Sequence, residues 1–307
     1  MRAIAIRADG SPPALIELPV REPGPGELLV HVRASSVNGF DLAVIGGWVR
    51  QFMEYRFPVV LGKDFAGTVE AVGEGASSFA VGDPVFGVVM TPYVGADGGF
   101  AEYLVVGEQY GVAAVPDGLD LGTAGALGLA GSAATTALDA LGIKAGQTVL
   151  ISGATGGVGA IAVQYAAAAG VRVLATARPG AEADLVLDLG AERALDWSGD
   201  LAREFRAIAP EGVDAVLHLA GEPEQLANLL ARGGCLASTL MFGPDQHPAA
   251  VSVIADPGRP RLERLASDVV GGRLRLPVSR TYELAEAPRA LADFTGGTVG
   301  KLAVSVS

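Results

Sequence analysis

The chain has 307 residues, enough for two domains that each bury a core of their own. Acidic residues outnumber basic ones by 34 to 22, and the formal charge of -12 opposes nonspecific binding to nucleic acid or to anionic lipid. The single cysteine, Cys235, excludes an internal disulfide and a zinc site built from several cysteines.

The first part of the chain is rich in short β-strand patterns. The opening residues, "MRAIAIRADGSPP", lack the apolar core of a signal peptide, and no stretch approaches the roughly 18 apolar residues of a membrane span. We therefore expect a cytoplasmic protein without a membrane partner or a nucleic-acid partner. Across residues 1–117, runs such as "ELLVHVRASSV" alternate with turns rich in proline and glycine, which predicts a strand-dominated domain.

From residue 118 the pattern changes to helices and strands in alternation. The expected helices cover residues 123–141, the stretch around 161, and residues 181–189, 201–209 and 261–270, with strands such as "QTVLISG" and "VDAVLHLA" between them. This spacing predicts a parallel, doubly wound α/β sheet over residues 118–270. The final strands, in residues 271–307, are expected to return to the first domain, and "VSVIA" at residues 251–255 is a candidate edge strand for a dimer.

The segment "SGATGGVGA" carries the clearest chemical signal. It follows a predicted strand and opens a predicted helix, and it places Ala154, Gly156 and Gly159 on the three glycine positions of the dinucleotide-binding fingerprint. Bare backbone lets a pyrophosphate approach the main-chain N–H groups at the positive end of the helix. We expect the dinucleotide to contact Ala154, Thr155, Gly156, Gly157 and Val158.

The end of the next strand predicts which dinucleotide is preferred. An acid there would bond the ribose 2'-hydroxyl and repel a 2'-phosphate. Thr176 occupies that place, "LATARPG" contains no acid, and Arg178 follows two positions later. A hydrogen bond from Arg178 to the 2'-phosphate is worth about 1.5–3 kcal/mol, so the sequence favours NADPH over NADH. The alternative is that Arg178 is a solvated loop residue.

The whole chain resembles a known superfamily. Segments such as "ASSVNGFD", "PVVLGKDFAGTVEAVG", "GGFAEY", "GLAGSAATTALDAL" and "GQTVLISGATGGVG" are similar to those of medium-chain dehydrogenases/reductases, and within them to the zinc-free quinone oxidoreductases that include zeta-crystallin. The resemblance implies a GroES-like catalytic domain at residues 1–117 and 271–307, a Rossmann domain at residues 118–270, bound NADPH and often a homodimer.

No metal is expected. The resemblance places Asn38 where zinc-dependent relatives have a catalytic cysteine, and Lys63 and Asp64 where they have a histidine and a glutamate. The three histidines are scattered along the chain. Without zinc to hold an alkoxide, alcohol oxidation is disfavoured, whereas a quinone or an enone can accept hydride with only hydrogen-bond donors and a proton.

The resemblance also implies roles for individual residues. Asn38 is expected near the nicotinamide, or else as a turn residue. Lys63 is a proton source or a lysine paired with Asp64, Tyr55 lies in a segment that lines the cleft in relatives, and Asp41 is expected to bond turn backbone. Further cofactor contacts, each with a packing role as its alternative, are Thr135, Trp197, Ala220, Gly221 and Lys301.

Three functions remain open on this basis. The first is an NADPH-dependent, metal-free reductase of a small-molecule quinone or α,β-unsaturated carbonyl. The second is an enoyl-thioester reductase of the same fold, which is disfavoured because Trp48 stands where those relatives have a tyrosine, unless a register shift brings in Tyr55. The third is an NADPH-binding protein with a structural or regulatory role.

Overall fold

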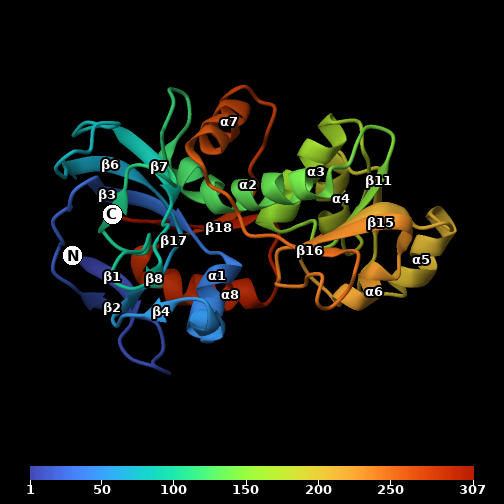
Figure 1. Cartoon of the computed structure of the whole chain (residues 1–307), viewed down its shortest axis with the longest axis horizontal. Helices are drawn as coiled ribbons and strands as arrows, with labels where there is room; N and C mark the ends of the chain where they lie inside the picture. Colours follow the sequence, from blue (N-terminus) through green and yellow to red (C-terminus); the bar gives the residue numbers. More distant parts are fainter. The chain divides into compact units, whose positions relative to one another are not determined.

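The computed structural model describes residues 1–307 and divides them into two compact units. The first unit consists of residues 1–129 and 257–307, and the second of residues 130–256 (Figure 1). None of the helices combines the length and the hydrophobicity that crossing a membrane requires.

These units differ from the domain boundaries expected from the sequence. The sequence pattern gave helix α7 (Arg259–Val270) to the second domain, whereas the structure groups it with the first unit. The reason is its anchor: Arg259 at the start of α7 donates hydrogen bonds to the carbonyl oxygens of Glu108 at 2.6 Å and Val112 at 3.3 Å. Helix α2 (Leu121–Leu141) runs across the division at residue 129.

The first unit is built mainly from β-structure. Its largest sheet has seven strands in the order β10-β7-β6-β3-β18-β17, and β9 also pairs with β3. The C-terminal strand β18 pairs antiparallel with β3, with Ala303 opposite Ser36. This sheet contains β3 (Glu27–Ser36), β6 (Asp64–Val72), β7 (Pro84–Val88), β9 (Tyr103–Gly107), β10 (Val112–Ala114), β17 (Val278–Glu283) and β18 (Lys301–Ser305).

Smaller elements complete this unit around a core that includes the fully buried rings of Phe65 and Phe100. A second sheet has the order β2-β1-β5, and a two-stranded sheet pairs β4 with β8. These elements are β1 (Arg2–Ile6), β2 (Ala14–Glu17), β4 (Glu54–Tyr55), β5 (Val59–Val60), β8 (Tyr93–Val94), α1 (Gly39–Ile45), α8 (Ala287–Thr295) and two short 3-10 turns (Trp48–Gln51 and Leu284–Glu286).

The second unit confirms the predicted doubly wound α/β fold. Its six strands are all parallel, in the order β13-β12-β11-β14-β15-β16, so the strand order reverses direction between β11 and β14. The strands are β11 (Thr148–Ile151), β12 (Arg172–Thr176), β13 (Arg193–Leu195), β14 (Val213–His218), β15 (Leu230–Ser238) and β16 (Ala250–Ser252). The helices are α3 (Gly157–Ala168), α4 (Ala181–Asp188), α5 (Leu201–Ile208) and α6 (Pro223–Ala227).

The edge strand expected at residues 251–255 is found in part, as β16 (Ala250–Ser252), which pairs only with β15. Val251 on this strand is 38% exposed and the following Ile254 is 76% exposed. An open strand edge with apolar neighbours is suited to pairing with a second copy. The homodimer stays a prediction.

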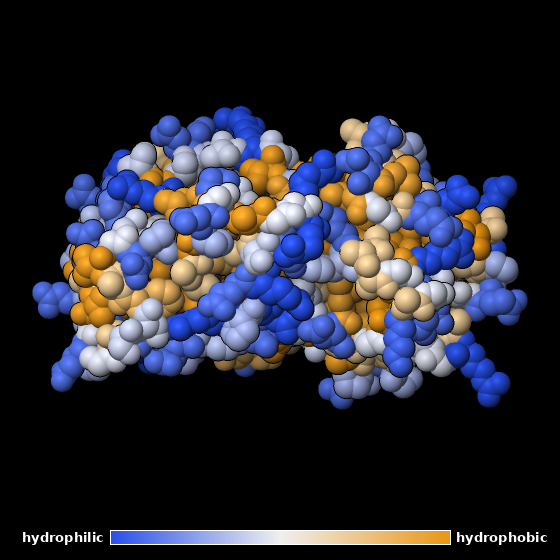
Figure 2. Space-filling view, turned by 90° about the horizontal axis from the view of Figure 1, so that it is seen from above, coloured by the Kyte–Doolittle hydropathy of each residue, from blue (hydrophilic) through white to orange (hydrophobic).

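On the face drawn in Figure 2, hydrophilic residues are spread between scattered apolar ones.

Candidate functional site

A buried polar network surrounds the carboxylate of Asp64, the first residue of β6. Asp64 has no exposed surface. Its Oδ2 accepts hydrogen bonds from Ser36 Oγ at 2.5 Å and from Asn38 Nδ2 at 2.8 Å. Its Oδ1 accepts one from the backbone N–H of Leu129 at 2.7 Å. A buried charge needs such donors, because it has lost those of water.

The counter-charge of Asp64 is Lys301, the first residue of β18. The Lys301 ammonium is 3.5 Å from Asp64 Oδ2, and it donates to Asn38 Oδ1 at 2.6 Å and to the carbonyl oxygen of Val37 at 3.0 Å. Burial lowers the pKa of Lys301, while the nearby charges of Asp64 and Asp41 act in the opposite direction. Its ammonium is therefore in contact with three oxygen atoms of the first unit, whereas the sequence had suggested a contact with the cofactor.

The amide of Asn38 is fixed on both sides by this network. Its Nδ2 donates to Asp64 and, at 3.2 Å, to the carbonyl oxygen of Ser36, while its Oδ1 accepts from Lys301. Both amide hydrogens are thus occupied. A substrate oxygen would have to displace the longer bond to Ser36 before Asn38 could donate to it, so the network gives Asn38 one orientation.

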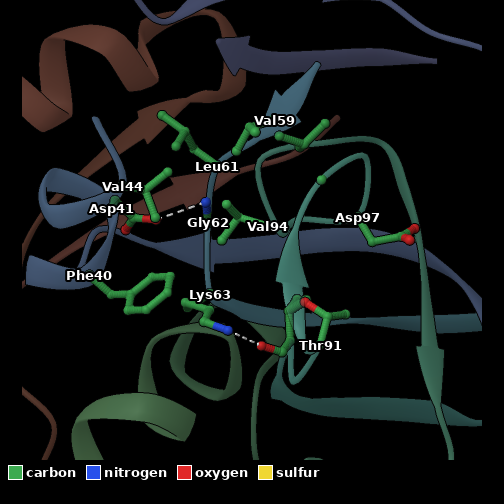
Figure 3. Close-up of a pocket in the computed structure, with 13 residues that line it drawn as sticks. Phe40, Asp41, Val44, Val59, Leu61, Gly62, Lys63, Thr91, Val94 and Asp97 are labelled. Carbon is green, nitrogen blue, oxygen red and sulfur yellow. Dashed lines mark hydrogen bonds between the residues drawn. The ribbon is translucent and has the colours of Figure 1, made fainter. Parts of the chain in front are cut away.

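Lys63 borders a small, partly open pocket (Figure 3). Its ammonium donates to the carbonyl oxygen of Val89 and lies 4.6 Å from the ring centre of Phe40. Burial lowers the pKa of Lys63 to about 8, although the charges of Asp41 and Asp64 favour its protonated form. The pairing of Lys63 with Asp64 that the sequence left open is not found, because Asp64 pairs with Lys301.

Asp41 points into the same region and has the structural role expected for it (Figure 3). Its two oxygens accept backbone hydrogen bonds from Asn38 and from Gly62, each at 2.9 Å. Burial raises the pKa of Asp41 to about 6, against the effect of those two hydrogen bonds. The carboxyl group thereby ties the start of α1 to the segment that carries Lys63.

The hydroxyl group of Tyr55 on β4 already donates a hydrogen bond within the protein. Its hydroxyl donates to the carbonyl oxygen of Val44 near the end of α1 at 2.8 Å, and the Arg50 guanidinium lies 4.2 Å from its ring centre. Burial raises the pKa of Tyr55. To donate to a substrate, the hydroxyl would first have to leave Val44.

The residues at the positions where zinc-dependent relatives bind metal do not fit a zinc ion. Zinc takes thiolate, imidazole and carboxylate ligands, whereas Asn38 offers an amide and Lys63 a cation. The only carboxylate of the set, Asp64, is neutralised by Lys301. Nowhere in the chain are three or more histidine, cysteine, aspartate or glutamate side chains grouped to hold a metal ion.

The glycine-rich loop of the second unit joins β11 to α3. A Cβ on Gly159 would lie 2.3 Å from the carbonyl oxygen of Gly153 and 2.5 Å from Cα of Ala154, so tight packing of helix on loop requires glycine there. A Cβ on Gly156 would meet only the oxygen of Gly153, at 3.5 Å. Packing inside the protein therefore does not explain Gly156, whereas the approach of a ligand to bare backbone does.

The N-terminus of α3 has no cap from the side chain of its N-cap residue, Gly156. The first N–H groups of a helix need acceptors, and they favour an anion such as a pyrophosphate. These features fit a dinucleotide, and Ala154, Thr155, Gly156, Gly157 and Val158 would hold its phosphates.

Hydrogen bonds bring several predicted cofactor residues to one edge of the sheet. Thr176 at the end of β12 accepts from the backbone N–H of Gly153 at 3.0 Å. Ser152 Oγ accepts from the N–H groups of Leu219 and Ala220, at 3.1 and 3.4 Å. These contacts join the loops after β11, β12 and β14. Ligands of doubly wound sheets bind at this carboxyl edge, where the strand order reverses.

His218 is a residue of this edge that the sequence gave no reason to select. Its ring nitrogens lie 2.9 Å from Ser238 Oγ and 3.1 Å from the carbonyl oxygen of Gly221. Burial lowers the pKa of His218. The imidazole therefore links the end of β14 to its own loop and to β15. No ligand-type pattern marked it, because Ser238 lies on another strand and Gly221 contributes only its backbone carbonyl oxygen.

Arg178 and Trp197, each predicted separately to contact the cofactor, lie close together with a third residue, Glu182. The Arg178 guanidinium lies 5.4 Å from the Trp197 ring centre and forms an ion pair with Glu182 at 2.5 Å. Glu182 was not considered from the sequence. Thr135 in α2 donates its hydroxyl to the carbonyl oxygen of Gly131 at 2.8 Å, so its hydrogen is used within its own helix.

Two family models match the chain at the places where these features lie. Residues 24–117 match the alcohol dehydrogenase GroES-like domain, and residues 157–255 match the zinc-binding dehydrogenase domain. A β-rich unit of the first type joined to a parallel, doubly wound sheet defines a two-domain dehydrogenase/reductase.

Solved structures agree with this assignment. The chain is 27% identical to the quinone oxidoreductase from Coxiella burnetii, with a TM-score of 0.89 over 100% of this chain and 99% of that one. It is 32% identical to an alcohol dehydrogenase superfamily protein from Novosphingobium aromaticivorans, with a TM-score of 0.86 over 100% of both chains. A mycobacterial protein solved in complex with NADPH is 29% identical, with a TM-score of 0.84 over 99% of each chain.

Longer curated proteins are also similar. A mycocerosic acid synthase-like polyketide synthase of Mycobacterium tuberculosis is 37% identical over 89% of this chain and 14% of its own length. Erythronolide synthase EryA2 of Saccharopolyspora erythraea is 38% identical over 94% of this chain and 8% of its own length. The chain thus spans a small part of each of these two relatives.

The chain belongs to the medium-chain dehydrogenase/reductase superfamily. Within it, the chain is similar to the quinone oxidoreductases, as its sequence motifs predicted.

The Lys301–Asp64 pair predicts strong coupling between two residues that are far apart in sequence. Lys301→Met leaves a buried carboxylate without its counter-charge and should lower the free energy of unfolding by about 3–5 kcal/mol. Adding Asp64→Asn should recover part of that loss, because it removes the uncompensated charge. Urea unfolding of both single variants and the double variant measures the coupling. Losses that simply add, within about 0.5 kcal/mol, would show that the pair is not coupled.

We expect substitution by alanine to affect stability at Gly159 but dinucleotide binding at Gly156. Gly159→Ala should lower the free energy of unfolding by about 1–3 kcal/mol, since the new methyl group meets backbone atoms. Gly156→Ala should change it by less than about 1 kcal/mol while weakening dinucleotide binding. Denaturant unfolding and nucleotide titration of both variants separate the effects. Equal stability losses would contradict the packing argument.

Proposed function

We propose that the chain is an NADPH-dependent, metal-free reductase that transfers hydride to a quinone or an α,β-unsaturated carbonyl. The observation that carries the proposal is the Gly156 loop, whose bare backbone and uncapped helix lie where the strand order reverses. The similarity to quinone oxidoreductases supports the substrate class, and the NADPH complex of the mycobacterial relative supports the cofactor. Arg178 supplies a cation near the end of β12 for a 2'-phosphate.

When bound, the nicotinamide supplies a hydride to the electron-poor carbon of the substrate. The protein must then provide a proton and stabilise the negative charge that develops on the substrate oxygen. We assign the proton donor to Lys63, because its ammonium has a pKa of about 8 and contacts a carbonyl oxygen and an aromatic face.

A second candidate is reduction of an enoyl thioester. It is favoured by the similarity of almost the whole chain to parts of two polyketide synthases. Hydride addition to a double bond conjugated with a thioester is the same chemistry as enone reduction, and it needs the same proton donor. The tyrosine that this reading would use, Tyr55, is bonded to Val44.

The first test is turnover. Loss of NADPH absorbance with a naphthoquinone, a benzoquinone, a linear enone and an enoyl thioester should show oxidation by one of the first three classes. Faster turnover of the thioester would establish the second candidate instead. Tight NADPH binding without oxidation by any of the four would favour a structural or regulatory role.

The role of Lys63 predicts a characteristic pH profile. The protonated ammonium is the active form, so kcat should be constant below pH 8 and fall as the pH rises through the pKa of about 8. Lys63→Met should lower kcat by about 10²- to 10⁴-fold and remove this limb of the profile. Lys144→Met, which changes an exposed lysine, is the control. A full rate with an unchanged profile in Lys63→Met would show that another group donates the proton.

A further inference from the structure

A carboxylate lies beside the end of β12, although the sequence segment there, "LATARPG", contains no acidic residue. Glu182 lies in the first turn of α4, and its side chain turns back toward the end of β12. Its Oε2 accepts the backbone N–H of Arg178 at 2.8 Å, while its Oε1 accepts the Nε and Nη2 groups of Arg178 at 2.8 and 2.5 Å. Arg178 follows the last residue of the strand, Thr176, by two positions.

The Glu182 side chain is more buried than the Arg178 side chain with which it pairs. The side chain of Glu182 is only 11% exposed, compared with 54% for that of Arg178. Burial favours the neutral acid, but hydrogen bonds from the side chain and backbone of Arg178 and from the Trp197 side chain outweigh it and lower the pKa of Glu182. Glu182 therefore carries its negative charge at neutral pH, in a fixed position at the end of the second strand.

A charge at this place acts on one particular part of a dinucleotide. In doubly wound sheets the adenosine ribose lies at the end of the second strand, where a carboxylate accepts its 2'-hydroxyl and repels a 2'-phosphate. Arg178 has the opposite effect, but its guanidinium is already shared with Glu182. A 2'-phosphate must compete with Glu182 for Arg178, whereas a 2'-hydroxyl need not.

We propose that Glu182 is a specificity-determining residue that opposes Arg178 and limits the preference of this chain for NADPH over NADH. The inference rests on the proposed function, in that the glycine loop must bind a nicotinamide dinucleotide. Arg178 attracts the 2'-phosphate. Glu182 repels the same phosphate and competes with it for the hydrogen bonds of Arg178. The Trp197 ring packs near the guanidinium. The pair, rather than Arg178 alone, sets the ratio of the two affinities.

The test measures the dissociation constants of NADPH and NADH by calorimetry on the full chain and on Glu182→Gln. Glutamine keeps the shape of the side chain and removes its charge. The substitution should raise the affinity for NADPH relative to NADH by about tenfold or more, as expected when a charged hydrogen bond no longer competes. Asp184→Asn is the matched control, because it removes one charge from the same helical turn and should change the ratio by less than about threefold.

A second variant keeps the test decisive if Glu182→Gln folds poorly. Arg178→Ala leaves the carboxylate unopposed and should shift the ratio about tenfold or more toward NADH. Thermal unfolding of each variant verifies its fold. Ratios that stay within twofold of the native value in folded Glu182→Gln or in Arg178→Ala would overturn the inference. Failure of the native chain to bind either nucleotide would instead refute the proposed function.

Discussion

The burial of the Asp64 charge is the constraint on which the rest of the first unit depends. A carboxylate without exposed surface is tolerated only when donors surround it, and here four donors come from three separate segments. One of them, Lys301, begins the strand β18 that pairs with β3. The need to neutralise one charge thereby joins the C-terminal strand to the middle of the sheet and orients Asn38 at the same time.

The same constraint separates the roles of a buried lysine, Lys301, and a partly buried one, Lys63. Because Asp64 is taken by Lys301, Lys63 is left with the carbonyl oxygen of Val89 and the ring of Phe40 as its partners. Burial lowers the pKa of both lysines. Release of a proton from Lys301 would weaken three interactions at once, whereas Lys63 would lose far less. The environment thus makes one lysine a structural cation and the other a suitable proton donor.

Features that depend on local pattern could be predicted from the sequence. The strand at residues 148–151, the glycine loop and the alternation of helices and strands follow from hydrophobic periodicity and from bare backbone at a fixed place. The short helices α1 and α6 were not predicted. They have seven and five residues, too few to show a helical period, and packing rather than propensity decides them. The partnership of Lys301 with Asn38, 263 residues away, has no local signal at all.

The end of β12 shows what a local sequence pattern leaves out. The stretch after β12 contains a cation and no acid, but the first turn of α4 returns a carboxylate to the same spot four residues later. Arg178 lies just before α4, and the first turn of that helix brings Glu182 back to it, so the charge of such a site belongs to the turn as well as to the strand end. Specificity is a difference between two affinities, and a group that repels one ligand contributes as much as a group that attracts it. The charge at the end of β12 is therefore that of the Arg178–Glu182 pair and not that of Arg178 alone.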